Sequence, residues 1–145
     1  MSIRFRLATL AFLLGSPAYA AQTPPVEPVD QLMTTARAAI DAQDWSGAIS
    51  TLLDLVDAAP DNADAYNLLG YASRKSGDPD RAWAFYDAAL RINPNHLGAL
   101  EYQGELFILK GDIAAAEATL VRLAAACGVC AEYADLTAAL GDAGS

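Results

Sequence analysis

Two cysteines three positions apart are the residues with the most distinctive chemistry in this chain. Cys127 and Cys130 lie in a Cys-Gly-Val-Cys segment, and the chain has no other cysteine. In an oxidising compartment such a pair most simply forms a disulfide that closes a tight turn. Two alternatives remain open: a redox-active dithiol with Cys130 at a helix N-terminus, and a Cu(I) or Zn(II) site completed by His96, the single histidine. Ala131 stands where a haem attachment signal needs histidine.

The negative charge of the chain argues against two classes of partner, nucleic acid and anionic lipid. There are 18 acidic and 9 basic residues, which gives a formal net charge of −9. Phosphate binding needs clustered Lys and Arg, so neither nucleic acid nor anionic lipid is expected as a partner. Arg74 and Lys75 form the one adjacent basic pair after residue 20. They could anchor a carboxylate, or they could stabilise the C-terminal end of a helix.

Signatures of catalysis are missing from the sequence. It contains no Gly-x-Ser-x-Gly, no glycine-rich phosphate loop and no His-Glu-x-x-His. The acidic residues follow helix surfaces and helix caps, so paired catalytic carboxylates are not indicated. We therefore expect a protein that is not an enzyme and that needs no cofactor and no metal.

The first twenty residues have the pattern of a cleavable signal peptide. Arg4 and Arg6 precede an apolar stretch at 7–14, and Ala18-Tyr-Ala20 is a small-x-small site. We expect cleavage after Ala20 and export to the periplasm of a Gram-negative bacterium. The apolar stretch is far shorter than the roughly 20 residues that cross a bilayer, so stable membrane insertion is not expected. Removing these residues changes the net charge to −11.

The body of the chain repeats itself every 34 residues. Each unit predicts two amphipathic helices, with an aspartate that caps the second helix and, in two units, a glycine that ends the first. A shift of 34 aligns five sets of residues: Asp44, Asp78 and Asp112; Ala48, Ala82 and Ala116; Pro60 and Pro94; Gly70 and Gly104; Gly77 and Gly111.

These residues resemble the tetratricopeptide repeat, whose pattern is W-x2-L-G-x2-Y, A-x3-F and P over 34 residues. The middle unit carries most of that pattern; only Ser73 departs from it, where the family has a large aromatic residue. In the third unit Gly128 replaces the closing proline, and the first unit is degenerate in its first helix. The matching residues of the middle unit are Tyr66, Leu69, Gly70, Ala82, Tyr86, Ala89 and Pro94.

The resemblance implies an all-α fold, a right-handed α-solenoid of three helix pairs plus a C-terminal capping helix. The repeats are expected at 29–62, 63–96 and 97–130, and the capping helix at 130–140, so that the repeat domain covers 29–140. A disordered proline-rich lead-in is expected at 21–28 and a flexible tail at 141–145. The small residues, including Gly70, Ala82, Ala89, Gly104 and Ala116, are expected where paired helices approach closely. A Cys127–Cys130 disulfide would then fix the last repeat to the capping helix.

The resemblance also implies a function. Tetratricopeptide domains bind a peptide or a partner helix in a concave groove lined by the first helix of each pair. The residues that it places in the groove are Met33, Arg37, Ile40, Asn67, Tyr71, Arg74, Lys75, Glu101, Glu105 and Ile108. The Lys and Asn pairs of the chaperone-binding carboxylate clamp are not reproduced. We expect a periplasmic adaptor or assembly factor that binds another protein or peptide of the cell envelope. The alternative is a thiol redox or metal-handling protein that acts through Cys127 and Cys130.

Overall fold

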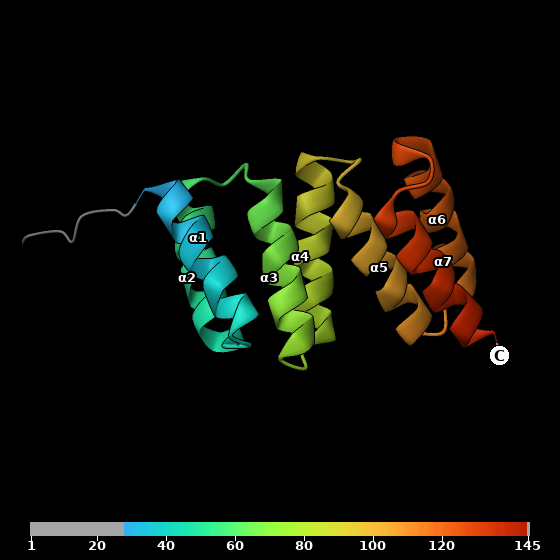
Figure 1. The fold of residues 1–145 in the computed structure, drawn as a ribbon, viewed down its shortest axis with the longest axis horizontal. Coiled ribbons are helices and arrows are strands. Elements are labelled where there is room, and N and C mark those ends of the chain that lie inside the picture. Colours follow the sequence, from blue (N-terminus) through green and yellow to red (C-terminus); the bar gives the residue numbers. More distant parts are fainter. Residues whose placement is uncertain (1–27, 145) are drawn as a thin grey trace, which may run out of the picture.

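A computed structural model describes residues 28–144 of the chain, and these form seven helices in a row (Figure 1). No strand occurs in this part of the chain, so the all-α prediction is confirmed. None of the helices described is both long and apolar enough to cross a membrane. The predicted signal peptide and most of the lead-in lie outside the described residues. The helices are α1 (Val29–Asp41), α2 (Trp45–Ala58), α3 (Ala63–Lys75), α4 (Pro79–Ile92), α5 (Leu97–Leu109), α6 (Ile113–Cys127) and α7 (Ala131–Ala143).

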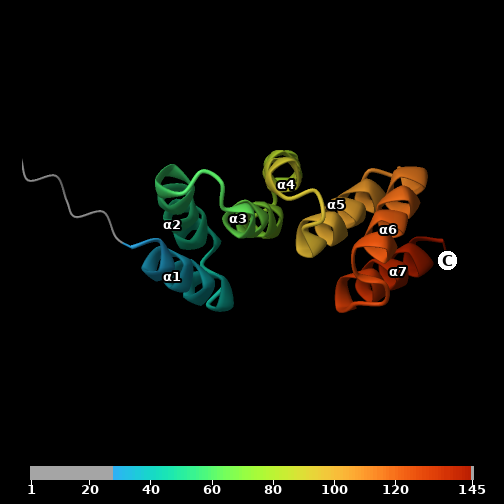
Figure 2. The ribbon, with the colours of Figure 1, turned by 90° about the horizontal axis from the view of Figure 1, so that it is seen from above.

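The helices pack in the order in which they follow along the chain. The three pairs are α1 with α2, α3 with α4, and α5 with α6, and neighbouring pairs meet through α2 with α3 and α4 with α5. The last helix, α7, packs against both α5 and α6. Seen from above, α2 lies to one side of its partner α1, and α4 lies to the same side of its partner α3 (Figure 2). We call the side formed by α1, α3, α5 and α7 the odd-helix side.

The same cap starts the second helix of each pair. The cap is an aspartate: Asp44, Asp78 or Asp112. In each, one carboxylate oxygen accepts a hydrogen bond from the backbone N–H of the residue three positions later, with N···O distances of 3.0, 2.9 and 3.1 Å. The residue before each aspartate has a positive φ: 57° at Gln43, 91° at Gly77 and 78° at Gly111. Glycine adopts this backbone readily and glutamine does not. The three turns therefore share one geometry, although the first has Gln43 at the position where the other two have glycine.

The small residues lie at close helix contacts in the core, as the sequence predicts. One of them, Gly104, contacts a different helix from the one expected. Ala82, Ala89 and Ala116 are fully buried. A Cβ atom at Gly70 would lie 2.3 Å from the ring of Tyr86 on α4, so this glycine admits the ring. A Cβ atom at Gly104 would lie 2.5 Å from Leu136, which belongs to α7. The third pair therefore uses its glycine to receive the capping helix.

The capping helix extends further than the sequence predicts. The expected end was residue 140, followed by a flexible tail, whereas α7 continues to Ala143. Leu140 is half-buried and packs against the C-terminal core, which holds the last turn in place. Leu136 is fully buried in the same core. A helix with a buried stripe thus covers the open end of the stack, as repeat proteins require.

We expect Gly77→Ala to lower the free energy of unfolding by about 1 kcal/mol, because alanine at this positive φ is strained. No atom lies within 4 Å of the added Cβ, so packing does not contribute. Gly141→Ala is the matched control: its Cβ also meets nothing, but it lies inside a helix. There alanine should raise stability by up to about 1 kcal/mol. Urea denaturation of both variants checks this; equal effects would contradict the assigned turn.

Candidate functional site

An aromatic ring pair with an arginine and a glutamate forms the centre of the odd-helix side. Tyr71 and Arg74 come from α3, and Tyr102 and Glu105 from α5. The guanidinium of Arg74 forms an ion pair with the carboxylate of Glu105. Its carbon lies 5.1 Å from the ring centre of Tyr102 and 6.0 Å from that of Tyr71, and the two ring centres are 5.4 Å apart. We call these four residues the central cluster. It joins the second repeat to the third.

Two further side chains extend the central cluster towards α2. The ammonium of Lys75 lies 5.5 Å from the ring centre of Tyr71, and the ring of Trp45 meets Tyr71 edge-on with centres 6.1 Å apart. Cations and aromatic edges at these distances are attracted to the face of a ring. Lys75 is exposed, whereas Tyr71 is half-buried. The central cluster and Lys75 together therefore present rings and an ammonium to the surface.

The expected role of Arg74 and Lys75 as an anchor for a carboxylate is not supported at Arg74. Its positive charge is already paired with Glu105, and about three quarters of its side chain is buried. Both residues lie in the last turn of α3, where cations stabilise the end of a helix. Only Lys75 keeps an exposed charge. The alternative given above, charge stabilisation at a helix end, fits the geometry of both residues.

Glu101 is a buried acid at the edge of the central cluster. Only 8% of the residue is exposed, and its carboxylate oxygens do not count among the buried, unpartnered side-chain atoms of residues 28–144, so they reach solvent. The pKa of its carboxyl is raised from 4.5 to about 7, mainly by burial and further by the charges of Glu105, Asp135 and Glu132. Arg74 lowers it in part. An acid in such surroundings is half-protonated near neutral pH.

Asn67 lies one turn before Tyr71, as the spacing predicts. Its amide packs against the backbone of Gly98 on α5, where an added Cβ would lie 3.0 Å from Nδ2. Its Oδ1 atom is buried and has no hydrogen-bond partner among the residues described. Asn67 thus contacts the neighbouring repeat while keeping an unused acceptor.

Four other expected site residues do not join the central cluster. Met33 packs against the N-terminal core and Ile108 against the C-terminal core, so both contribute to helix packing. Ile40 is half-buried and Arg37 is exposed, and both lie on α1. The structure therefore brings Tyr71 and Arg74 of α3 together with Glu105 of α5, and it leaves Ile108 and the expected residues of α1 apart.

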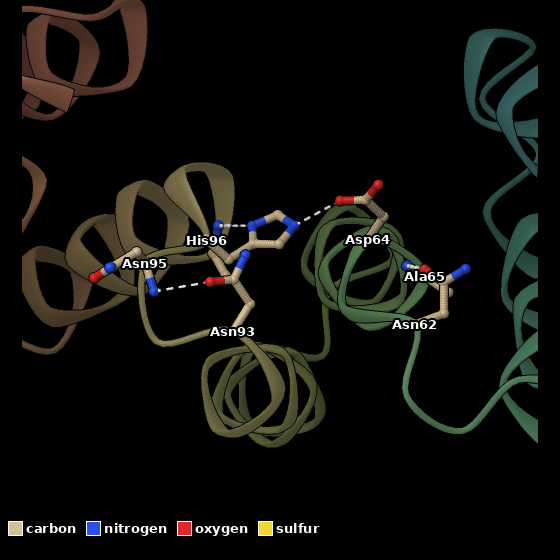
Figure 3. A network of polar contacts seen from close by, with 7 residues as sticks. Asn62, Asp64, Ala65, Asn93, Asn95 and His96 are labelled. Atoms are coloured by element: carbon tan, nitrogen blue, oxygen red, sulfur yellow. Dashed lines mark hydrogen bonds and ion pairs between the residues drawn. The ribbon is translucent and has the colours of Figure 1, made fainter. Parts of the chain in front are cut away.

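The two cysteines and His96 serve separate parts of the structure. Cys127 and Cys130 lie at the two ends of the turn from α6 to α7, with their Cα atoms 5.8 Å apart. His96 caps α5: its Nδ1 accepts from the N–H of Ala99 at 3.1 Å, and its Nε2 lies 2.8 Å from Oδ1 of Asp64 on α3 (Figure 3). This pattern places the imidazole hydrogen on Nε2. Among residues 28–144, no three His, Cys, Asp or Glu side chains are grouped closely enough to hold a metal ion, so His96 is not brought to the two cysteines.

Three residues near the site were missed by the sequence analysis. Tyr102 stacks in the central cluster, and the acids Glu132 and Asp135 come from α7. The period could have found the acid at 135, because a shift of 34 takes Glu101 onto Asp135. The sequence predicts for α7 only the role of covering the end of the core. In the structure it also lines the odd-helix side next to α5.

Comparisons with known proteins agree with this architecture. Two models of the tetratricopeptide repeat match, over residues 33–96 and 73–140. No curated protein sequence matches the chain. The TPR2B domain of yeast Sti1, in a complex with pHsp70, has a TM-score of 0.73 and 18% identity, covering 80% of this chain and 95% of that one. The Yersinia enterocolitica type III secretion chaperone SycD, in complex with a peptide of the translocator YopD, has a TM-score of 0.69 and 17% identity. The match covers 79% of this chain and 88% of that chain. MamA from Desulfovibrio magneticus RS-1 has a TM-score of 0.63 and 19% identity; the match covers 68% of this chain and 55% of that chain.

Glu101 should make the protein more stable in mild acid than in mild base. Because its pKa is raised in the folded state, folding favours the protonated form; this stability is complete below pH 4.5 and is lost as the pH rises through about 7. Between pH 4.5 and about 8, the free energy of unfolding of Glu101→Gln should therefore change less than that of the wild type, by on the order of 2 kcal/mol. Denaturation at several pH values measures it. The exposed Glu117→Gln is the control, and an equal effect of both variants would contradict the assignment.

Proposed function

Since this chain belongs to the tetratricopeptide repeat family, we propose that it binds a segment of another protein on its odd-helix side. The observation that carries this proposal is the central cluster, in which Tyr71 and Tyr102 stay only half-buried beside a paired Arg74 and Glu105. Two similar structures support it, since Sti1 was solved in a complex with pHsp70 and SycD with a YopD peptide.

The chemistry of the cluster suits an extended polypeptide. Tyrosine offers a rigid apolar face with a polar end and loses little entropy on binding, so it is enriched at protein interfaces. The Arg74–Glu105 pair holds the rings of α3 and α5 in one arrangement before a partner arrives. A surface that is ordered in advance pays less of the entropic cost of association. Binding rather than catalysis is the activity that follows.

We further propose that the protein works as an adaptor or assembly factor in the periplasm, after cleavage behind Ala20. The pattern of residues 1–20 supports export, and a net charge of −11 for the remaining chain keeps nucleic acid and anionic lipid unfavourable as partners. A Cys127–Cys130 disulfide suits the same oxidising compartment. Its role would be structural, joining the end of α6 to the start of α7.

The proposed function is tested by recovering partners from an extract of the cells that make the protein. Tyr71→Ala and Lys75→Ala should each lower the recovery of a specific partner, by at least about tenfold for Tyr71→Ala, because a central ring contact is lost. Arg91→Ala is the control, since it removes an exposed charge from α4.

Quantitative mass spectrometry of the bound fractions provides the measurement. A partner held equally by all four proteins would place the binding surface elsewhere. A partner lost on Cys127→Ser but kept by Tyr71→Ala would favour the thiol alternative.

The proposed export and disulfide are tested together by the intact mass of the protein taken from the periplasmic fraction. We expect a chain that starts at Ala21 and that is lighter by two hydrogens than its reduced form. Treatment with a reductant before measurement is the control. A mass that includes Met1, or one that shows two free thiols, would overturn the respective proposal.

A further inference from the structure

A cavity of about 420 Å³ lies between α2 and α4. These two helices lie on the same side of their partners (Figure 2), and they do not pack closely against each other. Four residues of α2, spaced three and four apart, form one wall, and the turn after α3 and the first turn of α4 form the other. We call the cavity the second-helix groove. Its lining residues are Ser46, Ile49, Ser50, Leu53, Ser76 and Arg81.

Ile49 and Leu53 give the second-helix groove an apolar floor. Both side chains pack on their inner side against the N-terminal core, and both are half-buried. The rest of each side chain faces the cavity that it lines. An apolar group placed there would remove this remaining surface from water, which favours binding.

Arg81 gives the groove a cation that is not neutralised. Among residues 28–144, no carboxylate forms an ion pair with its guanidinium. The guanidinium carbon lies 5.5 Å from the ring centre of Phe85, a contact that favours one position of this side chain at the wall. The two acids nearest to it in the chain have other partners. Asp78 accepts the backbone N–H of Arg81 at the helix cap, and the carboxylate of Asp80 lies 3.6 Å from the ammonium of Lys110.

The serine hydroxyls of the groove complement the guanidinium. Ser46 donates its hydrogen to Oδ1 of Asp44 at 3.1 Å, and Ser76 donates to the carbonyl oxygen of Ser73 at 2.8 Å. A hydroxyl has one hydrogen and two lone pairs, so both oxygens keep the capacity to accept. The groove therefore combines N–H donors, hydroxyl acceptors and an apolar floor. A polypeptide segment carries the matching groups: a carboxylate, backbone N–H groups and apolar side chains.

We propose that the second-helix groove binds a polypeptide segment in which an aspartate or glutamate lies next to an apolar residue. The carboxylate pairs with Arg81, the apolar side chain covers Ile49 and Leu53, and backbone N–H groups reach Ser46 and Ser76. The net charge of −9 opposes a segment with several acids, so the segment carries one carboxylate rather than a run. None of the lining residues belongs to the central cluster. The groove is thus a second site beyond the proposed function, and one molecule could hold two segments at once.

The first experiment is selection from a library of random short peptides displayed on phage, with the wild type and three variants of the full chain. Tyr71→Ala, which disables the central cluster, should still enrich peptides with one acid beside an apolar residue, and Arg81→Gln should not. Arg91→Gln is the matched control, because it removes another exposed arginine of α4 from outside the groove.

The outcomes separate the two sites. If Tyr71→Ala enriches nothing while the wild type does, or enriches peptides without an acid, the second-helix groove is not such a site and the proposed function stands. If Tyr71→Ala enriches the same peptides as the wild type, all of them lost on Arg81→Gln, the groove stands and binding at the central cluster does not. No enrichment by any of the proteins would overturn both.

The second experiment measures the affinity of the best peptide selected on Tyr71→Ala by calorimetry. Replacing its carboxylate by the amide, which has nearly the same shape but no charge, should weaken binding by about fivefold or more, as should Arg81→Gln. The amide peptide should bind the wild type and Arg81→Gln about equally. Thermal unfolding of Arg81→Gln checks that this exposed substitution leaves the fold intact. Equal affinity for the acid and the amide peptide would contradict the proposal, even if both bind tightly.

Discussion

A side chain of any size at residue 70 would collide with the ring of Tyr86, and the architecture depends on this contact. Because Gly70 has no side chain, the ring enters the space between α3 and α4 and is fully buried there. The two helices can then run close together, and the same device recurs at Gly104, which admits Leu136. Close pairs leave the remaining faces of α3 and α5 free to form the odd-helix side.

The electrostatics of the binding side arise from the way the repeats align. A period of 34 residues places Asn67, Glu101 and Asp135 at equivalent positions of α3, α5 and α7. Charge thus changes along the stack from a neutral amide to a pair of acids. Arg74 lies at the boundary, where Glu105 neutralises it and Tyr102 supports it. The result is an aromatic centre at α3 and α5 with an acidic neighbour on α5 and α7.

Local signals in the sequence predict most of the fold. The spacing of Asp44, Asp78 and Asp112 predicts three caps, and all three form the expected hydrogen bonds. The site is less predictable, because its geometry depends on contacts between repeats. Nothing local indicates that Arg74 pairs with a glutamate 31 residues later. Likewise, His96 looks like a ligand in isolation, and only its contacts with Ala99 and Asp64 reveal a cap. The period of 34 predicts which residues lie on the same face of the stack, but it does not predict which side chains contact each other.

The assignment of binding to the odd-helix side is tested most directly by hydrogen–deuterium exchange of the protein alone and with a bound partner segment. Protection is expected in α3 and α5, around Tyr71 and Tyr102, with the outer surface of α6 unchanged. Protection confined to α2, α4 or α6 would contradict the assignment.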